Sequence, residues 1–216
     1  MIVGTFSKIL NQTEIGQTGA HGQSPQFSVE MIDSVNYIFG NNTKINIDIE
    51  QQFYDKRDNS IFKFRFIQRP ANKILVLVGE IGQYISKYRI SSGDELILSI
   101  VNDNGRIKRY VDFIKNKDIV LFQKMNNYFK IINKDRLNQI NDWNVLSEGG
   151  ETNVKINNIR KVPPRSDSKT EVYCCDLFFN GSNKINSTHN NSIYILDLVN
   201  KIIKIYSWKF NKIEMP

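Results

Sequence analysis

The chain has 216 residues, of which 40% are hydrophobic and 24% are charged. This composition is close to that of average globular domains, so wholesale disorder and a collagen-like repeat are excluded. No run approaches the roughly 18 apolar residues that a membrane span needs, and Gly4, Ser7 and Lys8 interrupt any secretory pattern at the amino terminus. We therefore expect a cytoplasmic protein, with no membrane partner. The net charge of +7 favours an anionic partner.

The residues for several common chemistries are missing. The two cysteines, Cys174 and Cys175, are adjacent and point to opposite faces of an extended segment, so no disulfide framework is expected. Loops of the forms GxxxxGK[ST], GxGxxG and GxSxG are absent, and two histidines cannot supply a closed zinc site. The carboxylate pairs Asp48/Glu50 and Asp94/Glu95 lack a nearby acid-x-Lys element. We expect no metal, no cofactor and no enzyme activity, and we read Asp94 as a turn residue.

The composition favours β structure. The chain contains 31 isoleucines but only two alanines, so a β-branched residue is abundant and the best helix former is almost absent. In chain order, the first half predicts strands at 3–10 and around 27–29, separated by a glycine-punctuated loop. A helix at 32–39 follows from apolar residues at helical spacing, and a strand at 45–49 follows from strict alternation.

A hairpin of strands at 61–67 and 74–78 comes next. Alternation along its first strand places phenylalanines on one face and cations on the other, so one face builds a core while the other can meet an anion. The phenylalanines are Phe62, Phe64 and Phe66, and the cations are Lys63 and Arg65.

Further elements follow to the carboxyl terminus. We expect a helical turn at 84–88, and a type I′ hairpin turn at Asn102–Gly105 joining strands at 95–101 and 107–113. Beyond about Met125 the pattern is less regular. We predict a mainly β fold: a seven-stranded open barrel with one or two short helices at residues 1–124, followed by a smaller β-rich subdomain of unknown role at 125–216.

Much of the positive charge is concentrated in one segment. Between Lys56 and Lys73 six cations stand against the single anion Asp58. Such a cluster is typical of proteins that bind a phosphate backbone, because each neutralised phosphate releases counterions. A solvated hairpin face is the alternative interpretation.

One motif resembles a known family. Lys8-Ile9-Leu10, followed by Gly16-Gln17-Thr18-Gly19-Ala20-His21, is similar to the amino-terminal effector domain of EcoRII-type restriction endonucleases. The family has a second glycine where this chain has Ala20, and Gly22 stands before Gln23. The resemblance covers about residues 1–120.

The resemblance implies a DNA-binding pseudobarrel, the fold also found in plant auxin-response transcription factors. It implies an N-arm and a C-arm that grip the major groove, and a setting like that of LlaJI or McrBC-like restriction subunits. The N-arm corresponds to the glycine-rich loop and the C-arm to the hairpin at Arg65–Lys73. The partners would be double-stranded DNA and a nuclease or GTPase domain or subunit of the same restriction system.

The residue types agree with this role. Glycines let the backbone approach a duplex, amides and imidazoles reach base edges, and Arg and Lys contact guanine or phosphate. We expect these residues to contact DNA: Lys8, Gln17, Thr18, Gly19, His21, Gln23, Lys63, Arg65, Arg69, Asn72 and Lys73.

The sequence predicts a sequence-specific double-stranded DNA-binding module of a bacterial restriction-modification system. Two alternatives stay open: a self-contained Mg²⁺-dependent restriction endonuclease, and a basic protein-interaction module.

Overall fold

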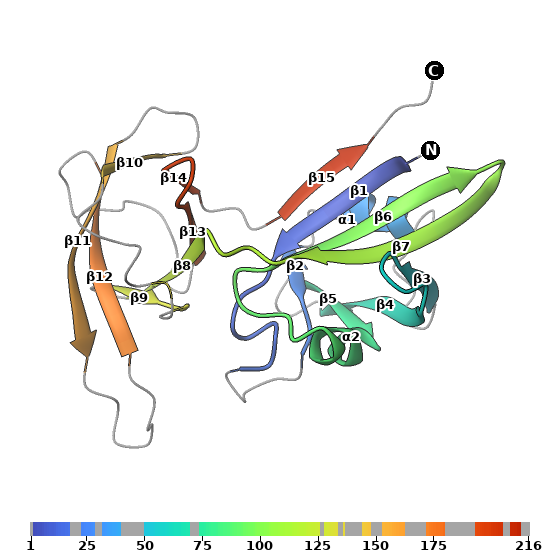
Figure 1. Cartoon of the computed structure of the whole chain (residues 1–216), viewed down its shortest axis with the longest axis horizontal. Coiled ribbons are helices and arrows are strands. Elements are labelled where there is room, and N and C mark those ends of the chain that lie inside the picture. Colours follow the sequence, from blue (N-terminus) through green and yellow to red (C-terminus); the bar gives the residue numbers. More distant parts are fainter. Residues whose placement is uncertain are drawn as a thin grey trace. The chain divides into compact units, whose positions relative to one another are not determined.

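The computed structural model shows a mainly β chain that divides into two compact units (Figure 1). One unit comprises Met1–Lys115 and Trp208–Pro216, and the other comprises Asn116–Ser207. The structure describes residues 2–17, 23–28, 32–39, 50–69, 74–125, 128–133, 136, 144–147, 153–162, 172–179, 193–204 and 208–212.

The first unit is built on an eight-stranded sheet with the order β15-β1-β6-β7-β3-β4-β5-β2. All neighbouring strands in it are antiparallel except β3 and β7, which are parallel. The seven strands of the amino-terminal segment agree with the expected fold class, and β15 adds an eighth. The strands are β1 (Ile2–Ile9), β2 (Gln26–Ser28), β3 (Gln51–Asp55), β4 (Ile61–Arg69), β5 (Ile74–Gly79), β6 (Glu95–Asp103), β7 (Arg106–Ile114) and β15 (Trp208–Lys212).

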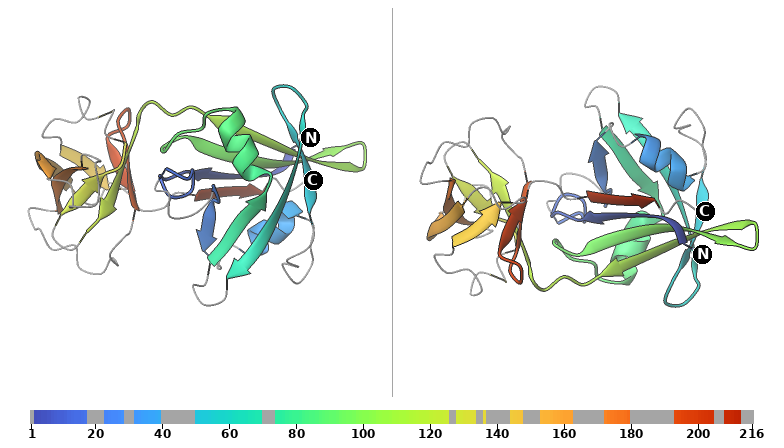
Figure 2. Two further views of the ribbon diagram at one scale, coloured as in Figure 1. Left: turned by 90° about the horizontal axis from the view of Figure 1, so that it is seen from below. Right: turned by 90° about the horizontal axis from the view of Figure 1, so that it is seen from above.

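Two helices contribute buried residues to the one core that this curled sheet encloses (Figure 2). The helix α1 (Ile32–Phe39) packs against β1 and β6, and α2 (Ile81–Lys87) packs against β4 and β5. The Nε of Arg109 donates a hydrogen bond to the carbonyl of Ile38 at 2.8 Å, which satisfies a terminal carbonyl and complements the helix dipole. The helix predicted at 32–39 is confirmed, and the turn predicted at 84–88 overlaps the end of α2.

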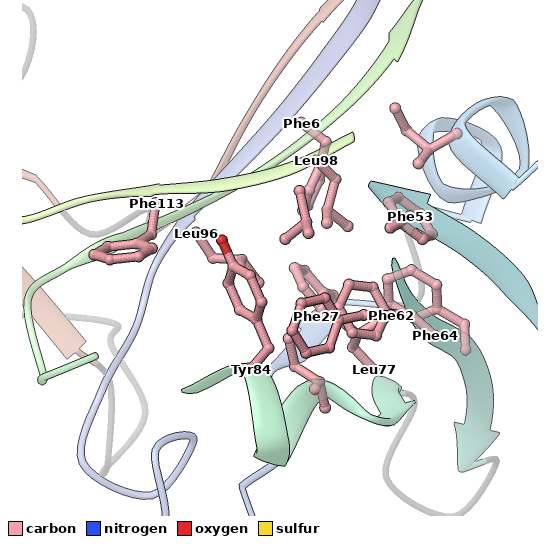
Figure 3. Packing of buried hydrophobic residues seen from close by; sticks show 14 of the residues in the cluster. Phe6, Phe27, Phe53, Phe62, Phe64, Leu77, Tyr84, Leu96, Leu98 and Phe113 are labelled. Carbon is pink, nitrogen blue, oxygen red and sulfur yellow. The ribbon is translucent and has the colours of Figure 1, made fainter. Parts of the chain in front are cut away.

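The core of the first unit is rich in aromatic rings (Figure 3). The predicted alternation in β4 is confirmed, because Phe62, Phe64 and Phe66 are buried while Lys63 is exposed. The Tyr84 ring reaches this cluster from α2, with its centroid 5.0 Å from that of Phe62. Each such side chain contributes about 1.5–3 kcal/mol when fully buried, so the phenylalanines of β4 anchor the strand whose other face carries cations.

The predicted type I′ turn between β6 and β7 is also supported. Asn104 and Gly105 both have positive φ angles, 51° and 84°, as a type I′ turn requires. The side chain of Asn102 accepts a hydrogen bond from the Gly105 N–H at 2.8 Å. Local residue types therefore account for this hairpin.

The second unit is a closed barrel with the strand order β10-β11-β12-β9-β8-β13-β14, which agrees with the expected smaller β-rich subdomain. Its interior includes Cys175, and both cysteines are buried and unbridged. Burial raises the pKa of the Cys175 thiol, which disfavours the reactive thiolate. The strands are β8 (Ile119–Lys124), β9 (Phe129–Ile131), β10 (Asn144–Ser147), β11 (Asn153–Val162), β12 (Val172–Phe179), β13 (Ile193–Asp197) and β14 (Ile202–Lys204).

The boundary between the units differs from the one expected at 124/125. The strand β8 pairs with β9 and β13, so it belongs to the second unit. The strand β15 pairs with β1 and returns the end of the chain to the first unit. The second unit is thus inserted between β7 and β15, because β15 pairs with the first sheet although it follows the second unit in the sequence.

Two further comparisons with the expected elements concern the remaining segments. The strand expected at 45–49 lies outside the described residues, and the patterns did not predict β3 or the strands β8 to β11. None of the helices in the described ranges is long and apolar enough to cross a membrane.

Candidate nucleic-acid interface

The glycine-rich loop begins with a single capped helical turn at residues 11–17. The Oδ1 of Asn11 accepts hydrogen bonds from the N–H groups of Thr13 and Glu14, at 2.9 and 3.2 Å. In return, Oε2 of Glu14 accepts from the Asn11 N–H at 3.0 Å. This reciprocal arrangement is a capping box, and the spacing Asn-x-x-Glu was its signal in the sequence.

The turn ends at Gly16, whose φ is +78°. The Gln17 N–H donates to the carbonyl of Gln12 at 2.9 Å, and the Gly16 N–H donates to that of Thr13 at 3.1 Å. These two bonds form a Schellman motif, which needs a left-handed residue where glycine stands. Gln17 is exposed directly after it. The other predicted residues of this loop, Thr18, Gly19 and His21, lie outside the described residues.

Lys8 is buried, and its burial argues against the predicted contact with DNA. Its Nζ lies 3.0 Å from Oε1 of Glu14, and the two side chains are 6% and 2% exposed. The ammonium also lies 5.0 Å from the ring centroid of Phe27. The same Oε1 accepts from the Gln26 N–H at 2.8 Å. Lys8 and Glu14 therefore tie β1 and β2 to the base of the loop.

Gln23 holds the far end of the loop against α2. Its Oε1 accepts a hydrogen bond from the Ser86 hydroxyl at 3.1 Å. A Cβ on Gly82 would lie 3.0 Å from that oxygen, and a Cβ on Gly16 would lie 2.9 Å from Cγ of Gln23. Two glycines thus make room for one glutamine. The structure gives this side chain a positioning contact, while its predicted base contact stays a prediction.

The outer face of β4 carries a line of cations. Lys63 and Arg69 are exposed and Arg65 is partly exposed. Because alternate residues of a strand share a face, these three side chains lie on the face opposite the phenylalanines. The Nε of Arg65 is buried without a hydrogen-bond partner. Asn72 and Lys73 lie outside the described residues.

The two predicted arms both join the sheet beside the same strand, β5. At the end of the glycine-rich loop, the carbonyl of Pro25 accepts from the Leu77 N–H at 2.9 Å. At the tip of the β4–β5 hairpin, Arg69 pairs with Ile74. Leu77 and Ile74 are three residues apart, which corresponds to roughly 10 Å along a strand.

The structure divides the cation cluster at Lys56–Lys73 into two groups. Nη2 of Arg57 lies 2.8 Å from Oδ1 of Asp112, and its guanidinium carbon lies 3.4 Å from the ring centroid of Phe113. These contacts hold Arg57 against β7, although 35% of its side chain is exposed. Lys56, by contrast, is exposed.

The one anion of the cluster, Asp58, is paired with a lysine that lies outside the cluster. Nζ of Lys87 lies 2.7 Å from Oδ2 of Asp58. This ammonium, together with Ser60, holds the pKa of the Asp58 carboxyl well below its usual value. Asp58 consequently does not offset the charge of the cations on β4.

No group of three or more His, Cys, Asp or Glu side chains that could hold a metal ion occurs among the described residues. Asp94 is a turn residue, as expected: its Oδ2 accepts from the Ser91 N–H at 2.8 Å and from Nζ of Lys115 at 2.9 Å.

Comparisons with known proteins give fold-level similarity of low degree. No family model matches the chain, and no curated protein matches it. Among solved structures, the Arabidopsis FUS3–DNA complex is similar with a TM-score of 0.39 and 13% identity, over 54% of this chain and 100% of that chain. At this level of similarity no function transfers from that protein to this chain.

Proposed function

We propose that the first unit is a double-stranded DNA-binding module and that the chain is the target-recognition part of a bacterial restriction system. In this proposal the glycine-rich loop is the N-arm and the β4–β5 hairpin is the C-arm, and they enter the major groove together. The catalytic step belongs to a nuclease or GTPase domain or subunit.

The observation that carries the proposal is the division of β4 into a phenylalanine face and a cation face. Lys63, Arg65 and Arg69 lie in one line, held in place by the core on the other side of the strand. Arginine pairs bidentately with guanine, and both cation types neutralise phosphate. The capped turn and the Gln23 contact fix the two ends of the neighbouring loop, and the carbonyl of Pro25 accepts a hydrogen bond from Leu77 of the same hairpin.

The test is selection of bound duplexes from a random pool, followed by affinity measurements by fluorescence anisotropy at several salt concentrations. We expect one sequence to be preferred by on the order of 10³-fold or more, and affinity to fall steeply with salt. Arg69→Ala should weaken binding by about 1–3 kcal/mol.

Arg106→Ala is the matched control, since Arg106 is an exposed arginine on β7, away from the two arms. It should change the affinity by less than about twofold. Equal affinities of the Arg69→Ala and Arg106→Ala proteins would remove the C-arm assignment. Nicking of plasmid DNA with Mg²⁺ would instead favour the endonuclease alternative, and absence of any DNA binding at low salt would favour the protein-interaction module.

A further inference from the structure

A row of side chains crosses four neighbouring strands of the first sheet, on the face opposite its core. The strand registers place Thr5 beside Ser99, Ser99 beside Tyr110, and Tyr110 beside Tyr54. These residues come from the adjacent strands β1, β6, β7 and β3 (Figure 1). Their neighbours along each strand, such as Leu98, Val111 and Phe53, lie in the core. The row therefore faces away from it.

The two tyrosines of this row contact each other. Their ring centroids are 6.0 Å apart and the rings are tilted by 47°. Both side chains are partly exposed. The next position in the row, Ser99, is small but buried, with 1% of its surface exposed. The surface open to a ligand is therefore that of the two partly exposed tyrosine rings.

Lysines flank the tyrosine pair. Lys56 follows Tyr54 two positions along the chain, and Lys63 pairs with Gln52, two positions before Tyr54. Both lysines are exposed. Within the described part of the chain, neither forms an ion pair.

One nearby acidic group, Asp112, lies two positions after Tyr110 on β7 and is paired with Arg57 at 2.8 Å. A second, Glu80, accepts a hydrogen bond from the Lys63 N–H at 2.7 Å. Both carboxylates thus have partners of their own, and the two lysines are exposed cations next to the rings. Aromatic rings beside unpaired cations favour a ligand that is flat and apolar in one part and anionic in another.

We propose that this row is a second nucleic-acid surface, which binds a single strand by stacking its bases on Tyr54 and Tyr110 and neutralising its phosphates with Lys56 and Lys63. Bases in a duplex are stacked on one another, so their faces are not available to these rings. The proposal goes beyond duplex recognition by the arms, although the two surfaces share Lys63. They can fail separately, since Arg69 belongs only to the arms and the tyrosines belong only to this row.

The experiment compares two fluorescent 12-nucleotide single strands, oligothymidine and a fully abasic strand with the same phosphates. We expect the wild-type protein to bind oligothymidine on the order of tenfold or more tightly than the abasic strand, because stacking needs bases. Equal affinities would overturn the proposal and leave a purely electrostatic surface. This comparison needs no variant.

Variants then locate the site. Replacing both tyrosines by leucine, Tyr54→Leu with Tyr110→Leu, keeps apolar bulk but removes the rings, and should lower oligothymidine affinity to the abasic level. Tyr54→Phe with Tyr110→Phe should keep it. Duplex affinity, measured in parallel, should be unchanged in both proteins but lowered by Arg69→Ala. If the leucine variant, shown to be folded by circular dichroism, binds oligothymidine as the wild type does, the assignment to this row is wrong.

Discussion

Lys8 and Lys108 each form an ion pair with a carboxylate, but they do so in different surroundings. The Lys8–Glu14 pair is 6% and 2% exposed, whereas the Lys108–Asp103 pair, with 3.1 Å between its charged atoms, is 42% and 52% exposed. An exposed pair is screened by water, but removal of one partner from a buried pair leaves an uncompensated charge inside the fold.

We therefore predict that Lys8→Met lowers the free energy of unfolding by about 3 kcal/mol or more, whereas Lys108→Met lowers it far less, because water screens its ion pair. Urea denaturation followed by circular dichroism measures both. Similar losses in the two proteins would contradict the assignment of Lys8 to the interior.

The burial of Lys8 also shows what the residue pattern could have revealed. Phe6, Lys8 and Leu10 follow one another at every second position, and all three are buried. Strand periodicity alone would have placed Lys8 beside the core. The family motif instead suggested a surface role, because a motif records residue types and not the environment that surrounds them.

At the scale of single elements, two glycines of the first sheet share a backbone conformation but differ in their surroundings. Gly79, at the end of β5, has a φ of +94°, and a Cβ there would lie 2.5 Å from the carbonyl oxygen of Lys63. Gly105, in the β6–β7 turn, has a φ of +84°, and a Cβ there would meet nothing within 4 Å. Gly79 thus allows the close approach of β5 to β4.

We predict that Gly105→Ala lowers the free energy of unfolding by about 1–2 kcal/mol, because alanine disfavours the left-handed backbone conformation. Gly79→Ala should lower it at least twice as much, because the backbone of β4 must move as well. Thermal unfolding of the two proteins under one set of conditions gives the comparison. A larger loss in Gly105→Ala would show that the contact with Lys63 does not limit this position.

The hairpin β4–β5 was predictable because its pattern is local. The alternation of Phe62, Lys63 and Phe64 indicates which face is buried, and no information about a distant strand is needed. In contrast, β3 has the sequence Gln51-Gln52-Phe53-Tyr54-Asp55, in which polar residues obscure the alternation. Its place between β4 and β7 depends on partners that are far away in the chain.

At the scale of the whole molecule, the inserted second unit leaves and rejoins the first sheet at the same end. Trp208 of β15 pairs with Lys8, Lys8 pairs with Leu96, and Leu96 pairs with Phe113 near the end of β7. Three strand spacings of about 4.8 Å separate the two junctions, or roughly 14 Å. A short linker can therefore replace the insertion.

We predict that a six-residue Gly/Ser linker joining Lys115 to Trp208 yields a first unit that unfolds cooperatively. Truncation after Lys124 is the comparison, because it removes β15 from the edge of β1 and leaves the apolar strand β8 without its partners. The truncated protein should unfold at a lower temperature and aggregate, since unpaired strands template association. Circular dichroism and light scattering measure both properties. Equal behaviour of the two proteins would show that β15 contributes little to the first unit.

The sequence by itself determined those features that neighbouring residues control: the mainly β class, the helix at 32–39, the turn at Asn102–Gly105 and the two faces of β4. Local sterics and periodicity act over a few residues and can be read in order along the chain. Only the tertiary structure decided the pairing of Lys8 with Glu14, the contact of Gln23 with α2 and the return of β15 to β1. Each of these depends on which distant strands pair and what they enclose, and no local pattern records that choice.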